Sequence, residues 1–216
     1  NKYGEVPLPP YINRKPTKND RLRYQTIYAK NNGSIAAPTA GLHFDSDLLI
    51  SLKEKGINVA YITLHVGLGT FKTIREEYIS NHEMHYESFQ IPQVTINKII
   101  NAIKNKNRII TVGTTSLRAV ESAFYGTNHK GEFSEEMNIK TGIQKTNLFI
   151  KPGFEFKIAS GLITNFHLPQ STLIILVSAF LGRKNCMQAY NEAIQRKFKF
   201  FSYGDSMLAF RPPPFS

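Results

Sequence analysis

The segment RIITVGTTSLRAVESAFY, residues 108–125, joins a short apolar run to a helical pattern through a glycine and two threonines. Arg108–Val112 predicts a short buried strand, and Thr115–Tyr125 predicts the helix after it. Between them, Gly113-Thr114-Thr115 predicts a turn at a helix N-terminus, where backbone N–H groups and hydroxyls can bind an anion or a ribose.

The turn has two interpretations, a ligand site or an ordinary capped connection between a strand and a helix. The segment lacks the Gly-x-x-x-x-Gly-Lys-Ser/Thr pattern of a P-loop, and Gly67-Leu68-Gly69 lacks the third glycine of a dinucleotide fingerprint. We expect Arg118 on the first turns of the helix, with Glu121 at i+3 as its possible partner.

Helical and strand patterns alternate on both sides of this unit. This alternation predicts an α/β fold with a mainly parallel sheet and packed helices. The expected strands are Ile57–Val66, Tyr86–Ile91, Leu148–Ile150 and Leu162–Phe166. The expected helices run from Asp45 or Ser46 to about Lys55, over Pro92–Lys104, over Ser171–Leu181 and over Asn185–Lys197.

Composition indicates a soluble globular protein, with 41% hydrophobic and 20% charged residues in 216. The single cysteine, Cys186, excludes an internal disulfide and fits a reducing compartment, so we expect a cytoplasmic protein. No signal-peptide pattern is found, and the apolar stretch Leu173–Leu181 is far shorter than the ~20 residues that cross a bilayer.

The net charge of +11 favours a polyanionic partner, of which nucleic acid is the commonest. The basic residues are concentrated near both ends of the sequence, within residues 1–30 and 181–216. Our candidates for phosphate contacts are Arg14, Lys15, Arg21, Arg23, Arg196, Lys197 and Lys199.

Two histidines follow predicted strands, His65 before Val66-Gly67 and His167 before Leu168-Pro169. In open α/β sheets, ligands bind at the carboxyl ends of the strands. We therefore expect His43, His65 and His167 to converge with the Gly113–Thr115 turn on one pocket. For each histidine alone, a ring satisfied by backbone hydrogen bonds remains the alternative.

Two further features allow functional and structural interpretations. His82-x-x-His85 could place two metal ligands on one helical turn, although the spacing differs from His-Glu-x-x-His. Asp205, in Tyr203-Gly204-Asp205, could serve a ligand or only close a tight turn.

Long strings of the sequence resemble bacterial S-adenosylmethionine:tRNA ribosyltransferase-isomerases, in the family's order and over nearly the whole chain. The matching strings are Pro7–Ile12, Arg23–Ala29, Ala36–Phe44, Thr63–Gly67, Gly113–Thr115, Leu148–Ile150, Thr164–Pro169 and Ser202–Asp205. So many strings in one order exclude a chance match.

The resemblance implies a reaction on tRNA with a GUN anticodon whose wobble base is 7-aminomethyl-7-deazaguanine. The family transfers the ribosyl part of S-adenosylmethionine to the aminomethyl nitrogen and isomerises it, giving epoxyqueuosine and releasing adenine and methionine. It implies no metal or redox cofactor, because S-adenosylmethionine is consumed as a substrate. The family fold is a barrel-like α/β domain with a smaller β-barrel domain inserted in its N-terminal half.

This chemistry agrees with the residue types present. A sulfonium acidifies the neighbouring ribose C5′ hydrogens, and a neutral imidazole is a suitable base near pH 7. We assign His43, His65 and His167 as catalytic. The residues assigned to substrate binding are Thr39, Gly67, Thr70, Gly113, Thr114, Thr115, Arg118, Asn165 and Asp205.

The sequence also departs from the family pattern. Leu68 stands where the family usually has Ala, and Ser160 stands where an Asp usually precedes the Leu162–His167 string. The resemblance implies that residues 1–216 are a C-terminal portion, incomplete at the N-terminus, with residues 1–20 as an extended connector. A separate N-terminal half is then a possible partner, and an inactive remnant that at most binds tRNA is the alternative function.

Overall fold

The strand, turn and helix expected at residues 108–125 organise the computed structural model, which describes residues 6–9, 11–67, 79, 82–125 and 141–211. Strand β3 (Ile110–Val112) leads through Gly113 into helix α4 (Thr114–Tyr125). Gly113 has φ +92°. This left-handed backbone favours glycine and turns the chain abruptly into the helix.

Strand β3 belongs to a three-stranded sheet of order β3-β5-β6, with β5 spanning Gly161–Asn165 and β6 spanning Ser206–Phe210. β3 and β5 are parallel, in the register Val112↔Ile163. β5 and β6 are antiparallel, in the register Asn165↔Ser206. The carboxyl ends of β3 and β5 and the start of β6 therefore meet at one edge of the sheet.

A second three-stranded sheet has the order β1-β2-β4 and is antiparallel throughout. Its strands are β1 (Thr63–His65), β2 (Glu87–Gln90) and β4 (Ile143–Thr146). The residue after β1 is bonded to the segment that precedes η1. Val66 O accepts hydrogen bonds from Ile35 N (3.1 Å) and Ala36 N (3.4 Å). This segment leads into the 3-10 helix η1 (Thr39–His43), which contacts β5.

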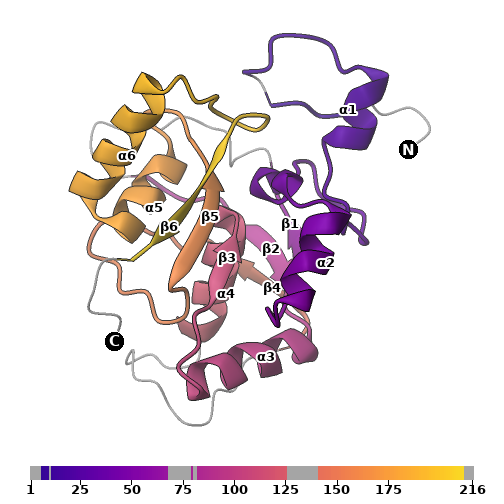
Figure 1. Cartoon of the computed structure of the whole chain (residues 1–216), viewed down its shortest axis with the longest axis vertical. Helices are drawn as coiled ribbons and strands as arrows, with labels where there is room; N and C mark the ends of the chain where they lie inside the picture. Colours follow the sequence, from indigo (N-terminus) through magenta and orange to yellow (C-terminus); the bar gives the residue numbers. More distant parts are fainter. Residues whose placement is uncertain (1–5, 10, 68–78, 80–81, 126–140, 212–216) are drawn as a thin grey trace.

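Two hydrophobic cores lie on the two sides of α4. One combines Leu117 with β5 and with helices α5 (Thr172–Leu181) and α6 (Arg183–Gln195), which lie together beside β5 and β6 in Figure 1. The other combines Ala119, Val120, Ala123 and Phe124 with β2 and helix α3 (Gln93–Lys104). Because α4 contributes to both cores, its position ties the two sheets together.

Two buried charged side chains of α4 reinforce this link. Arg118 donates from Nη1 to Glu87 Oε2 of β2 (2.6 Å) and from Nε to Leu148 O (3.0 Å). Glu121, fully buried, accepts hydrogen bonds from the backbone N–H groups of Lys157, Ile158 and Ala159, at 2.9–3.1 Å. Burial raises the pKa of the Glu121 carboxyl. The expected ion pair between Arg118 and Glu121 is wrong, because each finds its partner on a different segment.

The α/β class is confirmed, but the mainly parallel sheet is wrong for the described strands, of which only β3 and β5 pair in parallel. The physical reason lies in the connections. Between β5 and β6 the chain forms α5 and α6, which are joined only by Gly182. The second helix returns the chain to the end of the sheet where β5 finished. β6 therefore starts there and runs antiparallel to β5. Among the described strands no pairing joins the two sheets into a barrel.

Most expected elements are present with shifted ends, and a few differ. Asp45 and Ser171 cap helix α2 (Ser46–Glu54) and α5 by accepting from Leu48 N and Ile174 N. Leu148–Ile150 is not a strand, and only Thr63–His65 of the expected strand Ile57–Val66 is one. Helix α1 (Lys18–Arg23) begins inside the stretch expected to be an extended connector.

The placement of α1 separates it from most of the other helices. In Figure 1 it lies at the end of the molecule opposite α3.

Among the described residues, no helix combines the length and apolar character needed to span a bilayer.

Replacing Glu121 by Ala should lower the free energy of unfolding by about 3–5 kcal/mol, because three buried N–H groups lose their acceptor. The matched control is Glu192→Ala, which removes an exposed pair with Arg196 and should cost no more than about 0.5 kcal/mol. Urea denaturation of the three proteins measures both values. Equal effects of the two substitutions would contradict the structural role of Glu121.

Candidate functional site

A pocket of about 760 Å³, part of it open to solvent, lies at the edge where β3 and β5 end. The described side chains and backbone that line it come from six segments: the N-terminal stretch at Tyr11, η1 with the residues before it, the residue after β1, the start of α4, the end of β5 with the residues that lead into α5, and the loop before β6. They are Tyr11, Ala37, Pro38, Thr39, Ala40, Val66, Gly113, Thr114, Thr115, Thr164, Asn165, His167, Leu168, Ser171, Leu173, Phe201 and Ser202. None of these carries a carboxylate, an ammonium or a guanidinium, so the described lining has no permanent charge and sets a few polar groups among apolar ones.

A directed chain of hydrogen bonds runs through Asn165 at the end of β5. Thr39 Oγ1 donates to Asn165 Oδ1 (3.0 Å), and Asn165 Nδ2 then donates to His43 Nε2 (3.3 Å). With the amide in this orientation, His43 carries its proton on Nδ1. Because its proton is used, Thr39 offers lone pairs to the pocket and acts there as an acceptor.

His167, also in the lining, is fixed by its ring and its backbone. Its Nε2 lies 2.8 Å from Thr164 Oγ1, and its backbone N–H donates to Tyr190 Oη (3.0 Å). Burial lowers the pKa of His167 to about 4. The imidazole is therefore neutral at pH 7 and can accept a proton or a hydrogen bond.

The floor of the pocket includes the N-terminus of α4. Gly113, Thr114 and Thr115 all line it, and the first N–H groups of a helix have no partner within the helix. Gly113 N itself donates to Ile163 O of β5 (2.8 Å), which holds the turn against the neighbouring strand. The turn thus presents donors to an acceptor atom of a ligand.

Glycine at position 41 sets the shape of η1 beside this floor. A Cβ there would lie 2.1 Å from Tyr28 Oη and 2.8 Å from Thr26 Cγ2. Only glycine lets Tyr28 pack this close, which explains the glycine of the Ala36–Phe44 string.

The loop before β6 closes the pocket together with Tyr11. Tyr11 Oη hydrogen-bonds Ser202 Oγ, and the rings of Tyr11 and Phe201 lie 4.9 Å apart. Asp205 is exposed and accepts from Lys199 N (2.7 Å), so it closes the turn and does not line the pocket.

Sequence reasoning missed Tyr11, Thr164, Ser171, Phe201 and Ser202. Most of these lie in or beside the strings that resemble the family, which was the available signal.

The expected convergence is partial. His167, Asn165, Thr39 and the Gly113–Thr115 turn meet in the pocket, and His43 lies behind Asn165. His65 does not line it, since its ring packs against Gly33, where an added Cβ would lie 3.0 Å from Nδ1. Gly67 also lies outside the lining. Thr70 is outside the described residues.

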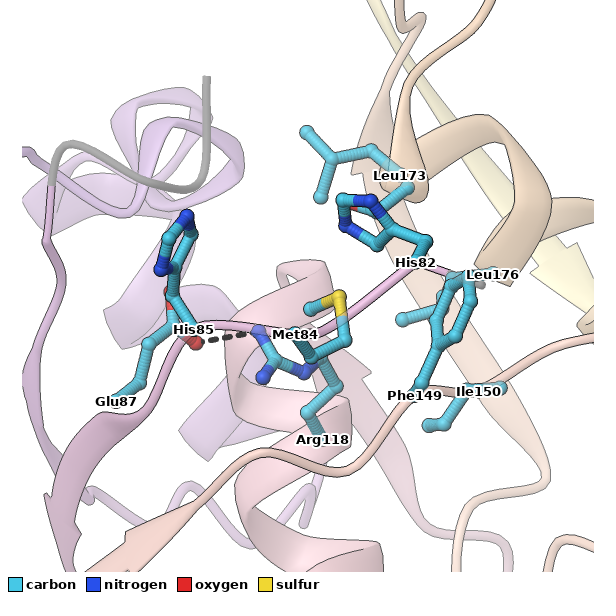
Figure 2. A pocket seen from close by; sticks show the side chains of 10 residues that line it. His82, Met84, His85, Glu87, Arg118, Phe149, Ile150, Leu173 and Leu176 are labelled. Atoms are coloured by element: carbon cyan, nitrogen blue, oxygen red, sulfur yellow. Dashed lines mark hydrogen bonds and ion pairs between the residues drawn. The ribbon is translucent and has the colours of Figure 1, made fainter. Parts of the chain in front are cut away.

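Arg118 lies away from this pocket. It is 4% exposed and pairs with Glu87 in a second pocket with His82, Met84 and His85 (Figure 2). Its place on the second turn of α4 faces it toward β2, not toward the helix N-terminus. In the described part of the chain, no group of three His, Cys, Asp or Glu residues could hold a metal ion.

The basic residues assigned to phosphate contacts fall into two groups. Arg14 holds Asp20 through both guanidinium nitrogens (2.6 and 2.8 Å), and Arg196 pairs with Glu192 (2.5 Å). The remaining five are exposed: Lys15, Arg21, Arg23, Lys197 and Lys199.

Asp20 brings the two ends of the sequence together. Besides Arg14, it accepts from Thr17 and from Tyr203 Oη (2.9 Å), and these bonds, that of Arg14 first, hold its pKa well below the usual range. The ring of Tyr203 packs edge-on against Tyr24 at 5.6 Å. The loop carrying Lys199 therefore lies against the segment of residues 14–24, beside the wall formed by Tyr11 and Phe201.

Comparison with known proteins gives one consistent result. The profile of a family described as queuosine biosynthesis protein matches residues 1–209. The S-adenosylmethionine:tRNA ribosyltransferase-isomerase of Polynucleobacter asymbioticus is 52% identical over 210 residues, which are 97% of this chain and 57% of that protein. The protein of the same name from Buchnera aphidicola subsp. Acyrthosiphon pisum is 54% identical over 207 residues, 96% of this chain and 56% of that protein.

A solved structure agrees with this. The S-adenosylmethionine tRNA ribosyltransferase of Thermotoga maritima has 40% sequence identity and a TM-score of 0.60, covering 78% of this chain and 50% of that one. The chain thus spans about 57% of the length of the curated relatives that it matches.

Stability should depend on pH through His167. Its folded-state pKa of about 4 lies below the ordinary 6.5, so between these values the unfolded chain binds a proton that the folded chain does not. Stability is therefore complete above pH 6.5 and falls as the pH drops toward 4, by up to roughly 3 kcal/mol for a shift of this size. Urea denaturation from pH 7 to pH 4.5 measures the loss.

The comparison variant is His167→Gln, with His85→Gln as control, because His85 is exposed. The first should flatten the pH dependence in this window, and the second should leave it as in the unchanged chain. An unaltered slope in His167→Gln would contradict a neutral, half-buried imidazole.

Proposed function

Because the chain belongs to the queuosine biosynthesis protein family, we propose that it carries a substrate site for transfer of the ribosyl part of S-adenosylmethionine to tRNA. In this reaction the acceptor is 7-aminomethyl-7-deazaguanine in tRNA with a GUN anticodon, and the products are epoxyqueuosine, adenine and methionine. The names of the relatives, which describe ribosyltransfer and isomerisation with S-adenosylmethionine and tRNA, support the assignment. A tRNA substrate supports a cytoplasmic location for the proposed reaction.

The observation that carries the proposal is the Thr39–Asn165–His43 chain in an uncharged pocket that sets a few polar groups among apolar ones. A ribose needs several donors and acceptors at defined positions. Thr39 supplies an acceptor, the turn at Gly113 supplies backbone donors, and His167 supplies a neutral imidazole. Asn165 is 2% exposed and holds Thr39 and His43 in one arrangement, as positioning of reacting groups requires.

His167 is the proposed proton acceptor among the three histidines. Being neutral throughout the physiological range, it can accept a C5′ proton that the sulfonium has acidified. Its low pKa makes the protonated form a strong acid, so it can pass the proton on to a leaving group such as adenine. His43 is a positioning residue in this scheme, since it contacts Asn165 and does not line the pocket, whereas His167 does.

The position of the basic residues supports tRNA as the partner. Lys15, Arg21 and Arg23 lie on the segment that Asp20 joins to the loop carrying Lys199. Two clusters far apart in sequence thus flank one wall of the pocket. A tRNA bound through its phosphates on this surface would lie beside the pocket.

Replacing Asn165 by Ala should lower adenine release by at least about a hundredfold, because the hydrogen-bond chain loses its centre. The assay measures adenine from S-adenosylmethionine in the presence of precursor tRNA. It is run on the chain alone and together with the part of a full-length relative that this chain does not match. The control is Asn185→Ala on α6, exposed and remote from the pocket, which should retain activity. Full activity of Asn165→Ala in both formats would refute the proposed site.

Binding of tRNA should weaken with salt through the exposed basic residues. The triple variant Lys15→Ala, Arg21→Ala, Arg23→Ala should reduce the slope of log affinity against log salt concentration by about 2–3. The control triple Lys53→Ala, Lys55→Ala, Lys104→Ala removes the same charge from the C-terminal ends of α2 and α3, including the residue after α2, and should leave the slope nearly unchanged. Equal losses in both triples would indicate a non-specific charge effect, contrary to the proposed surface.

A further inference from the structure

Thr164, the residue before Asn165 in β5, bonds the second histidine of the site. Its Oγ1 lies 2.8 Å from His167 Nε2 and 3.3 Å from the backbone O of Asn165. Thr164 is 1% exposed, so solvent has little access to the hydroxyl. Both Thr164 and His167 line the pocket of the proposed function. The single hydroxyl proton can therefore go to only one of two neighbouring atoms.

The number of hydrogen bonds that each arrangement allows decides between them. If the hydroxyl donated to His167 Nε2, the O of Asn165 would receive no proton from it, and one hydrogen bond would form. If the hydroxyl donates to the O of Asn165, its lone pairs accept from His167 Nε2–H, and both contacts are hydrogen bonds. Buried polar groups in folded proteins are hydrogen-bonded almost without exception, so the second arrangement is favoured.

The second arrangement leaves Nδ1 of His167 without a proton. The hydrogen bonds of the described residues reach this ring only at Nε2. In the described part of the chain, the buried side-chain atoms with no partner belong to Tyr24, Arg118 and Arg211, so Nδ1 is not enclosed by the protein. The half-buried ring thus has one free lone pair, on the nitrogen that a ligand in the pocket can reach.

We propose that Thr164 is a positioning residue that holds His167 in the Nε2–H tautomer and so makes Nδ1 the nitrogen that accepts the substrate proton. The identity of that proton, on the ribose C5′, rests on the proposed function, whereas the tautomer does not. In the transfer, Nδ1 takes the proton, the C–H electron pair stays on the carbon beside the sulfonium, and the ring becomes an imidazolium.

Proton uptake at Nδ1 requires no rearrangement of this network. Nε2–H donates to Thr164 before and after the transfer, and the positive charge that the ring gains strengthens this bond. In the opposite tautomer the only lone pair would be on Nε2, and the threonine hydroxyl that occupies it would first have to turn away. Polar groups that are already in place where charge develops lower the cost of the step.

The tautomer can be measured directly by nuclear magnetic resonance of the chain with ¹⁵N-labelled histidine at pH 7, without tRNA and without turnover. Protonated and unprotonated ring nitrogens resonate far apart, and His167→Gln identifies the His167 signals by their loss. We expect Nε2 at the position of a protonated nitrogen and Nδ1 at that of an unprotonated one. The reverse assignment would overturn the proposal.

Two substitutions at position 164 test the role of the hydroxyl. Thr164→Val keeps the shape of the side chain but removes the acceptor of Nε2–H. A proton on Nδ1, which solvent can reach, then becomes competitive, and the His167 signals should show a mixture of tautomers. Thr164→Ser retains the hydroxyl and should retain the single tautomer. An unchanged single Nε2–H tautomer in folded Thr164→Val would show that Thr164 does not select it.

The matched control is Thr111→Val on β3. Thr111 is 6% exposed, and its Oγ1 donates to Gly161 O at 3.3 Å, as that of Thr164 does to a backbone oxygen. The control removes an equivalent buried bond from the same sheet, so the His167 signals should stay as in the unchanged chain. Thermal unfolding shows which variants are folded. If Thr164→Val does not fold, Thr164→Ala takes its place, and the tautomer of the unchanged chain can overturn the proposal in either case.

Adenine release, measured in the same two formats as for Asn165→Ala, separates this inference from the proposed function. Thr164→Val should lower kcat at least about fivefold, because part of the molecules lack a free Nδ1 and the ring loses its fixed orientation. Thr164→Ser and Thr111→Val should retain activity. Unchanged kcat in Thr164→Val despite mixed tautomers would overturn Nδ1 as the proton acceptor. If the unchanged chain releases no adenine in either format, the proposed function fails, and the tautomer measurements still decide the role of Thr164.

Discussion

Helix α4 carries the constraint on which the rest of the structure depends, two buried charges three residues apart that point to different segments. Arg118 is paired with Glu87 of β2, and Glu121 accepts from the backbone just before β5. A buried charge that loses its partner is strongly destabilising, so neither segment can shift away from the helix at low cost. The two sheets are thus held at a defined distance from a single helix.

The geometry of the functional site follows from the contacts that α4 makes with both sheets. The N-terminus of α4 stands at the end of β3, and Glu121 holds the chain that enters β5, so Gly113 and Asn165 meet at one edge. The antiparallel return of β6 then brings Phe201 and Ser202 over the same edge. A ligand pocket at the carboxyl ends of strands therefore arises although only one strand pair there is parallel.

Asp20 holds together the surface segments around the pocket, as the buried charges of α4 hold the two sheets. Its carboxylate accepts from Arg14, Thr17 and Tyr203, which joins the N-terminal segment to the loop before β6. Arg14 and Arg196 looked equivalent to the other basic residues in the sequence, yet each is committed to a carboxylate. Each of these two arginines is therefore oriented by its carboxylate, while the net charge of +11 already counts both acidic residues.

The sequence by itself determined the local elements, because capping residues and short apolar runs act within a few positions: Asp45 and Ser171 cap their helices, and Gly113 makes the turn. It also determined the family, since matching strings need no geometry. Strand direction, the partner of Arg118 and the separation of His65 from the pocket were decided only by the tertiary structure. These features depend on contacts between segments far apart in the chain, and no spacing along the sequence encodes which buried charge meets which partner.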